Sequence, residues 1–153
     1  MPFRSVVRDA FTVVGIATRT ADDPPSEIGR LWQRFFAEDV AARVPHRTGG
    51  DVYSLYTEYE GDHTRPYTVV LGYTVAEIGP LPEGLVARVV PAATYAVLDG
   101  VAGRPDAIAA AWQSVYAAAL PRRYTVDFDV HHVDGERAGT VDVHVAVDAA
   151  PGA

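Results

Sequence analysis

One apolar pattern occurs twice in this chain of 153 residues, and it limits the possible folds more than any other feature. In residues 28–40, and again in residues 108–120, apolar side chains stand at positions 0, 3, 4, 7, 8 and 12 of the segment. This spacing is typical of a helix with one broad apolar stripe. The pair Trp32-Gln33 in the first segment matches Trp112-Gln113 in the second, which starts 80 residues later. The sequence therefore predicts two equivalent helices and an internal duplication.

Short runs rich in β-branched and aromatic residues surround both predicted helices, and Gly, Pro and Asp punctuate them as turns. The strands predicted from these runs are residues 3–8, 11–19, 52–59, 67–76, 85–90, 93–99, 124–132 and 140–148. Each half then reads β-β-α-β-β, with repeat one at about residues 3–78 and repeat two at about residues 85–148. A helix with one apolar stripe must bury that stripe against a sheet. We therefore expect residues 1–153 to form a single α+β domain, with an antiparallel sheet, two helices on one face and a ligand groove between the repeats.

The last two predicted strands alternate apolar and polar residues, which permits a prediction of their register. If apolar residues face each other, Val126 lies beside Val145 and Phe128 lies beside Val143. The polar pairs predicted on the other face are Asp127 with His144, Asp129 with Asp142, and His131 with Thr140. Two opposed carboxylates repel each other, which raises one pKa or recruits a cation. A solvated sheet face is the simpler interpretation of the same alternation.

The composition removes several classes of chemistry. The chain has no Cys, which excludes disulfides, thiolate catalysis and Cys-ligated zinc. All 13 basic residues are Arg, so Schiff-base and P-loop lysine chemistry are also absent. Serine never occurs in the G-x-S-x-G context of a nucleophile elbow. His131 and His132 are adjacent on a predicted strand and point in opposite directions, so they are poor joint metal ligands. We expect neither a cofactor nor a metal site.

The charge and hydropathy of the chain limit its partners. The formal net charge is −7, and the Arg residues are scattered along the chain, so direct nucleic-acid binding is not expected. No apolar run is long enough to span a membrane, and the N-terminal residues do not resemble a signal peptide. We therefore expect a cytoplasmic protein with no membrane partner.

Acidic and aromatic residues converge on the predicted groove. Glu58 and Asp129 stand at matching positions of the two strands that follow the helices. Carboxylates set among aromatic side chains suit a lipophilic cation, through ion pairing and cation–π attraction. The predicted ligand-binding residues are Asp129, Glu58, Tyr56, Tyr73, Trp112 and His131. Other aromatic residues at helical spacing, namely Trp32, Phe35 and Tyr116, are assigned to the core.

Several segments, taken in order, resemble the GyrI-like effector-binding domain family. They include FTVVGIAT at residues 11–18, YSLYTEYE at 53–60, VLGYTV at 70–75, PAATYAV at 91–97 and Phe128-Asp129-Val130. The resemblance covers about residues 3–148. It implies a duplicated architecture with a groove between the repeats for small, often aromatic and cationic molecules. The family's acidic position, usually Glu, falls on Asp129, and its aromatic position, usually Tyr, falls on His131.

The resemblance leaves three functional hypotheses open, because the family includes ligand-sensing domains of transcription activators, gyrase-modulating proteins and hydrolases of strained electrophiles. The leading hypothesis is a stand-alone protein that binds an apolar, cationic or electrophilic aromatic compound. The second is a hydrolase in which Asp129 or Glu58 acts as general base. The third is a protein-interaction modulator of a DNA topoisomerase, which would show an acidic surface and no deep pocket. Because the first strand is predicted at residue 3, we expect no DNA-reading helix-turn-helix.

Overall fold

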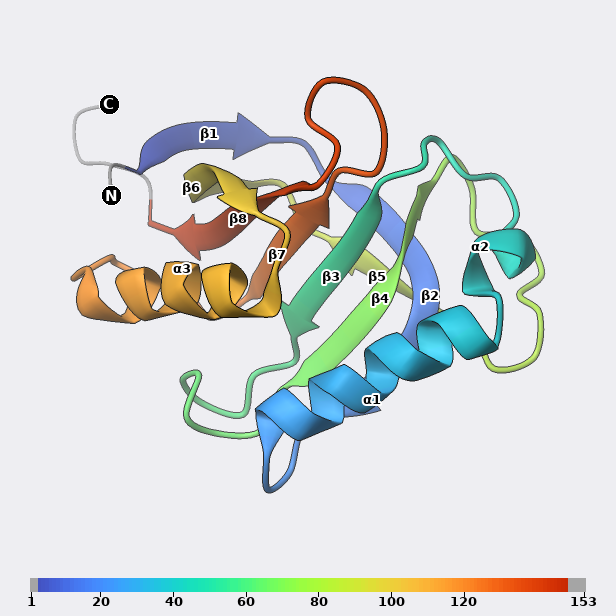
Figure 1. The fold of residues 1–153 in the computed structure, drawn as a ribbon, viewed down its shortest axis with the longest axis horizontal. Coiled ribbons are helices and arrows are strands. Elements are labelled where there is room, and N and C mark those ends of the chain that lie inside the picture. The colour runs from blue at the N-terminus through green and yellow to red at the C-terminus, as the bar shows by residue number, and fades with distance from the viewer. Residues whose placement is uncertain (1–2, 149–153) are drawn as a thin grey trace.

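The computed structural model describes residues 3–148, whose strands form one eight-stranded sheet. Figure 1 shows the two long helices on the same face of this sheet, with the middle strands visible between them. The strands are β1 (Arg4–Arg8), β2 (Phe11–Arg19), β3 (Val52–Thr57), β4 (Thr68–Val75), β5 (Val86–Val90), β6 (Ala93–Ala102), β7 (Val126–His131) and β8 (Thr140–Val147). The helices are α1 (Pro24–Ala37), α2 (Val40–Arg43) and α3 (Pro105–Ala117). The predicted α+β fold class, with an antiparallel sheet, is confirmed.

The strand order is symmetric about the centre of the sheet. It runs β1-β6-β8-β7-β3-β4-β2-β5, and every pairing is antiparallel. Strands β2, β4 and β3 of the first half mirror β6, β8 and β7 of the second. The first strand of each half is exchanged, because β1 pairs with β6 and β5 pairs with β2. The halves thus share one sheet through three strand pairings, and the pair β3–β7 lies at its centre.

Both helices follow the predicted stripes but end before the last apolar residue of each stripe. Helix α1 starts at Pro24, since proline suits a first helical turn, where the backbone N–H has no helical partner anyway. It ends at Ala37, and Asp39 adopts a left-handed conformation with φ 50° before Val40 opens α2. Helix α3 likewise starts at a proline, Pro105, and ends at Ala117, before the stripe of residues 108–120 is complete. Within residues 3–148, no helix is long and apolar enough to cross a membrane.

The sheet is buried on both faces. On the face that carries the helices, called the helix face below, Leu31 and Phe35 of α1 pack on the first half of the sheet. Ala111 and Val115 of α3 pack on the second half. On the far face, a second core is built around Phe128 and other buried side chains of both halves. Polar residues of the central strands therefore lie on buried faces. Alternation of apolar and polar residues predicts one solvated face, and the central strands have none.

The predicted register of the last hairpin is wrong by one residue. In the structure Phe128 pairs with His144, Asp129 pairs with Val143, and Val130 pairs with Asp142. Directly paired residues share a face, so Phe128 and His144 lie together on the far face, with ring centroids 4.3 Å apart. The prediction assumed one apolar and one solvated face, whereas both faces are buried here. Asp127 and Asp129 therefore lie on the helix face, away from the side chains of His144 and Asp142 that were expected opposite them.

A candidate ligand pocket between the helices

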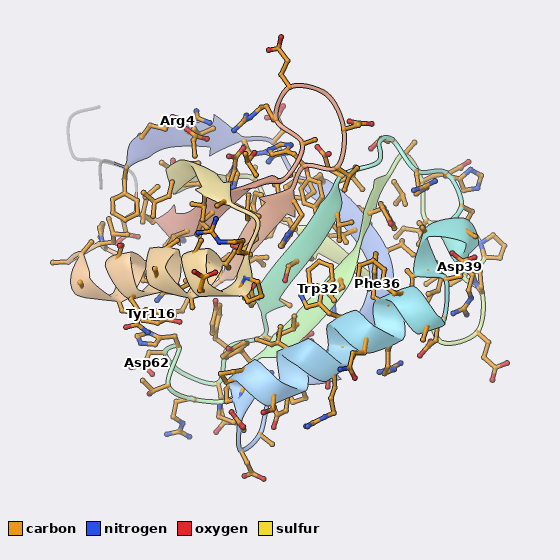
Figure 2. All side chains as sticks on the ribbon, viewed as in Figure 1. Arg4, Trp32, Phe36, Asp39, Asp62 and Tyr116 are labelled. Atoms are coloured by element: carbon orange, nitrogen blue, oxygen red, sulfur yellow. The ribbon has the colours of Figure 1, made fainter. Side chains whose placement is uncertain are left out.

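A pocket of about 820 Å³ opens between α1 and α3, above the central strands β3 and β7. Figure 2 shows Trp32 and Phe36 extending from α1 on one side, and Tyr116 beside α3 on the other. The connection between β3 and β4, residues 58–67, closes one end of the pocket with Tyr59, His63, Thr64 and Tyr67. The lining residues are Pro24, Pro25, Ile28, Trp32, Phe36, Tyr56, Tyr59, His63, Thr64, Tyr67, Gly103, Pro105, Ile108, Ala109, Trp112, Gln113, Tyr116, Arg122, Asp129 and His131.

Aromatic rings from both halves meet around this pocket. Trp112 of α3 contacts Tyr56 of β3 edge to face, at a centroid distance of 5.2 Å. Trp32 of α1 contacts the ring of His131 at 4.9 Å. Such rings offer large apolar surfaces with negative faces, which attract cations as well as apolar groups. The walls are therefore suited to a flat or multi-ring organic ligand.

The carboxylate of Asp129 lies at the floor of the pocket and has no charged partner in the part of the chain that the structure describes. Its residue is fully buried, yet it also lines the pocket. Oxygen Oδ2 accepts a hydrogen bond of 2.6 Å from the Tyr56 hydroxyl and one of 3.5 Å from the indole N–H of Trp112. Oxygen Oδ1 has no hydrogen-bond partner among the described residues. Burial raises the pKa of Asp129 to about 7, although the bonds from Tyr56 and Trp112 oppose that change.

Asp127 lies two residues earlier on the same face, and both of its oxygens accept hydrogen bonds. Burial raises its pKa as well, although the bonds from Tyr59 and Arg122 oppose that change. Its Oδ2 accepts hydrogen bonds from the Tyr59 hydroxyl at 2.5 Å and from Arg122 at 2.9 Å. Its Oδ1 accepts a 2.8 Å bond from the backbone N–H of Ala146. Burial lowers the pKa of Arg122, but the adjacent Asp127 carboxylate outweighs burial and leaves that pKa raised. The charge of Asp127 is therefore paired with a buried guanidinium, whereas Asp129 makes no hydrogen bond or ion pair with Arg122.

The histidines of the pocket supply no positive charge near neutral pH. Burial lowers the pKa of His131 to about 4. Burial and the nearby Arg122 guanidinium also lower the pKa of His63, whose ring stacks on Tyr116 at a centroid distance of 4.0 Å. Both imidazoles are therefore neutral polar groups in an otherwise aromatic wall. When Asp129 is ionised, the described pocket carries one unbalanced negative charge.

Comparison with known proteins identifies the family. A model described as "Cass2: Integron-associated effector binding protein" matches residues 6–147. The chain belongs to this family. The predicted resemblance to GyrI-like effector-binding domains is thereby confirmed. The transcriptional regulator BrlR of Pseudomonas aeruginosa is 32% identical over 153 residues, which cover 97% of this chain and 54% of BrlR. The chain thus spans about half the length of that curated relative.

Solved structures share the fold over almost the whole chain. An integron cassette protein from the mobile metagenome of Vibrio cholerae is 25% identical, with a TM-score of 0.76 and coverage of 96% of both chains. The structure of SAV2435 bound to tetraphenylphosphonium is 15% identical, with a TM-score of 0.78. That likeness covers 97% of this chain and 95% of the other, and it shows the fold alone.

The structure brings together four of the six predicted site residues. Asp129, Tyr56, Trp112 and His131 all line the pocket of this effector-binding protein. They come from β3, β7 and α3, so the central strand pair and one helix position them. A fifth residue, Tyr73, is buried under α1 instead, with its ring 5.7 Å from Phe35, and does not line the pocket.

Glu58 also lies outside the pocket. Strand β3 was expected to continue to residue 59, but it ends at Thr57, and Glu58 adopts a left-handed conformation with φ 53°. Its side chain is half exposed and pairs with Arg88 at 2.9 Å. A carboxylate base within the pocket would therefore have to be Asp129. The topoisomerase hypothesis predicted no deep pocket, whereas the structure has a pocket of about 820 Å³ between the helices.

Several lining residues were assigned differently from the sequence. Phe35 is buried in the core as predicted, but Trp32 and Tyr116 line the pocket and are partly exposed. Helical periodicity could not distinguish them, because the side of each stripe that faces the other helix is also the pocket wall. Tyr59, His63 and Tyr67 lie in a connection without periodicity. The only sequence signal for them was the density of Tyr between residues 53 and 67.

Proposed function

We propose that this member of the effector-binding family captures a lipophilic organic cation between α1 and α3, with Asp129 as the counter-charge. One observation carries the proposal: a fully buried carboxylate stands in an aromatic pocket, and within residues 3–148 one of its oxygens has no hydrogen-bond partner and no cation pairs with it. We propose further that the protein acts in the cytoplasm and needs no nucleic-acid or membrane partner.

The energetics of Asp129 favour a positive ligand. A carboxylate withdrawn from water without a partner costs several kcal/mol. A cation seated beside it recovers part of that cost, and each aromatic face adds about 0.5–2 kcal/mol of cation–π attraction. Pockets of roughly 300–1,000 Å³ are typical for small molecules, so the cavity of about 820 Å³ accommodates a ligand with several rings.

The neighbours of Asp129 have separate roles in this proposal. Tyr56 and Trp112 hold Oδ2 by donating hydrogen bonds, and Oδ1 has no hydrogen-bond partner among the described residues. Burial raises the pKa of Tyr56 well above its usual value, so its hydroxyl remains a donor. Trp32 and His131 form the opposite wall as apolar and neutral surface. A bulky cation would then contact rings on several sides and a carboxylate at the floor.

The family description and one fold neighbour support a ligand of this class. The family is named for effector binding, and the SAV2435 structure contains the lipophilic cation tetraphenylphosphonium. Tetraphenylphosphonium is therefore the probe of choice. Its four phenyl rings match an aromatic pocket, and its buried charge has no hydrogen-bond donor, so its binding reports on charge and ring contacts alone.

Isothermal titration of tetraphenylphosphonium at pH 8.5 tests the proposal. The wild-type protein should bind, and Asp129→Asn should weaken binding by about 30-fold or more, as is usual when one partner of a buried charge pair is removed. Glu58→Gln is the matched control, because it removes a carboxylate outside the pocket, and its affinity should stay within about twofold of wild type. Absence of binding, or equal losses in the two variants, contradicts the proposed function.

A further inference from the structure

The proton on Asp129 gives the pocket a second ligand class. We propose that Asp129 takes up a proton in the free protein in mildly acidic solution and exchanges that proton for the charge of a cationic ligand. The same pocket then takes two classes of compound: organic monocations when Asp129 is ionised, and neutral aromatic hydrogen-bond acceptors when it is protonated. This inference rests on the proposed function and adds a proton to its account of the site.

The geometry of the carboxyl group assigns the proton to one oxygen. Tyr56 and Trp112 both donate to Oδ2, and an indole N–H is unable to accept. Oδ2 therefore acts as the acceptor oxygen. Oδ1 is buried and has no donor within hydrogen-bond distance among the described residues. An ionised Oδ1 would be an uncompensated buried charge, whereas a protonated Oδ1 is a neutral hydrogen-bond donor at the floor of the pocket.

The groups packed around Asp129 give no alternative source of positive charge. From β3 it faces Ser54, its directly paired residue, and the Tyr56 hydroxyl, and from α3 it faces the Trp112 indole and Tyr116; all are uncharged near neutral pH. Along β7 it is flanked by Asp127 and by neutral His131, and β8 offers Val143.

The remaining charged groups lie at the closed end of the pocket. Arg122, from the segment between α3 and β7, is bound to Asp127 at 2.9 Å. Tyr59 of the β3–β4 connection donates to Asp127 as well, and His63 there is neutral. The nearby Asp127 carboxylate further raises the pKa of Asp129, to about 7 with burial as the larger cause. Protonation is therefore the way this site balances its charge when no cation is bound.

The exchange balances in atoms and charge. The protonated protein and a cation give the ionised protein with the cation bound, plus one proton released to solvent. With an exchange midpoint near pH 7, the apparent affinity for a permanent cation falls by about tenfold for each pH unit below the midpoint. A neutral acceptor shows the opposite trend, because it needs the Oδ1 proton that ionisation removes.

Two probes of matched shape test the inference. Tetraphenylphosphonium is the permanent cation, and triphenylphosphine oxide is a neutral compound whose oxygen accepts hydrogen bonds. Calorimetry in buffers of different ionisation enthalpy measures the protons released on binding. Tetraphenylphosphonium should release about 0.9 proton at pH 6 and less than about 0.1 at pH 8.5, and it should bind about 30-fold more weakly at pH 5.5 than at pH 8.5. Triphenylphosphine oxide should bind more tightly at pH 5.5 than at pH 8.5.

Asp129→Asn fixes the site in a neutral state with an amide donor. This variant should bind triphenylphosphine oxide with the same affinity at both pH values. Proton release from the wild type needs no variant, so a folding defect in Asp129→Asn leaves the test intact. Tetraphenylphosphonium binding at pH 8.5 with no proton release at pH 6 and no change in affinity overturns this inference alone. Failure of the cation to bind even at pH 8.5 overturns the proposed function as well.

Discussion

Two carboxylates on one strand, Asp127 and Asp129, occupy opposite kinds of surroundings. Both are fully buried and both lie on the helix face of β7. Asp127 receives a guanidinium, a hydroxyl and a backbone N–H. Asp129 receives a hydroxyl and a distant indole N–H, and one oxygen has no partner among the described residues. Asp127 thus has a cation, Arg122, and a backbone donor that Asp129 lacks.

Because Asp127 has this cation and Asp129 does not, we assign Asp127 a structural role and Asp129 a role in ligand binding. A paired buried carboxylate stabilises the local arrangement only as long as its partner remains. A buried carboxylate without a partner costs stability, and proteins tolerate such costs mainly at functional sites. We therefore expect substitutions at the two positions to have effects of opposite sign on stability and of very different size on ligand binding.

The largest effect is expected from Asp127→Asn. The substitution leaves Arg122, whose side chain is only 6% exposed, as a buried charge without a counter-charge. The free energy of unfolding at pH 8 should fall by about 3–5 kcal/mol, as measured by urea denaturation. The double variant Asp127→Asn/Arg122→Met removes both charges and should recover a large part of that loss. A single variant as stable as the wild type would refute the structural role given to Asp127.

Asp129→Asn should stabilise the protein, and only above acidic pH. The pKa of Asp129 is about 7 when folded and near 3.9 in an unfolded chain, so the folded state holds the extra proton between these values. Wild-type stability from this group is complete below the lower value and is lost as pH rises through the higher one. Unfolding free energies of the two proteins should agree at pH 4 and differ by roughly 2–4 kcal/mol in favour of the variant at pH 8.

The pH dependence of the difference in stability separates the effect of Asp129 from the titration of buried histidines. His131 and His144 both have pKa values lowered to about 4 by burial, and they reduce stability in acid in both proteins alike. Their contribution therefore cancels in the difference between variant and wild type. A difference that is constant from pH 4 to pH 8 would mean that Asp129 does not change its charge in this range.

Tyr56→Phe should have a smaller effect on ligand binding. It removes the 2.6 Å hydrogen bond that favours ionised Asp129, so the pKa of Asp129 rises further. Affinity for tetraphenylphosphonium at pH 6, where the ligand must displace the proton, should fall by about fivefold, equivalent to about 1 kcal/mol for one hydrogen bond. Calorimetric titration measures this loss. Unchanged affinity would show that the hydroxyl does not support the charged state.

The smallest effect is expected from Tyr73→Phe, the matched control for Tyr56→Phe. Tyr73 packs in the core under α1, where its ring lies 4.7 Å from the guanidinium of Arg47, outside the pocket. Loss of its hydroxyl should leave tetraphenylphosphonium affinity within twofold of wild type in the same titration. A loss equal to that of Tyr56→Phe would mean that the site extends beneath α1.

The sequence predicted the elements and their order, because the helical stripes and the β-branched runs are local signals. It failed where a residue's direction depends on distant packing. The alternation in β7 allowed two registers, and the fully buried sheet selected the one that puts Asp129 beneath α3. The repeat suggested equal roles for Glu58 and Asp129, but β3 ends one residue before Glu58. Trp32 packs against the core and also lines the pocket. Helical periodicity alone does not distinguish a core position from a pocket position.

A carbon-13 NMR titration of the Asp129 carboxyl group tests the central claim most directly. In the free protein its chemical shift should change with a midpoint near pH 7. With saturating tetraphenylphosphonium, the same carbon should remain at the ionised shift down to a distinctly lower pH. A midpoint near 4 in the free protein, unchanged by the ligand, would contradict the account. Asp129 would then be an ordinary carboxylate whose charge needs no cation.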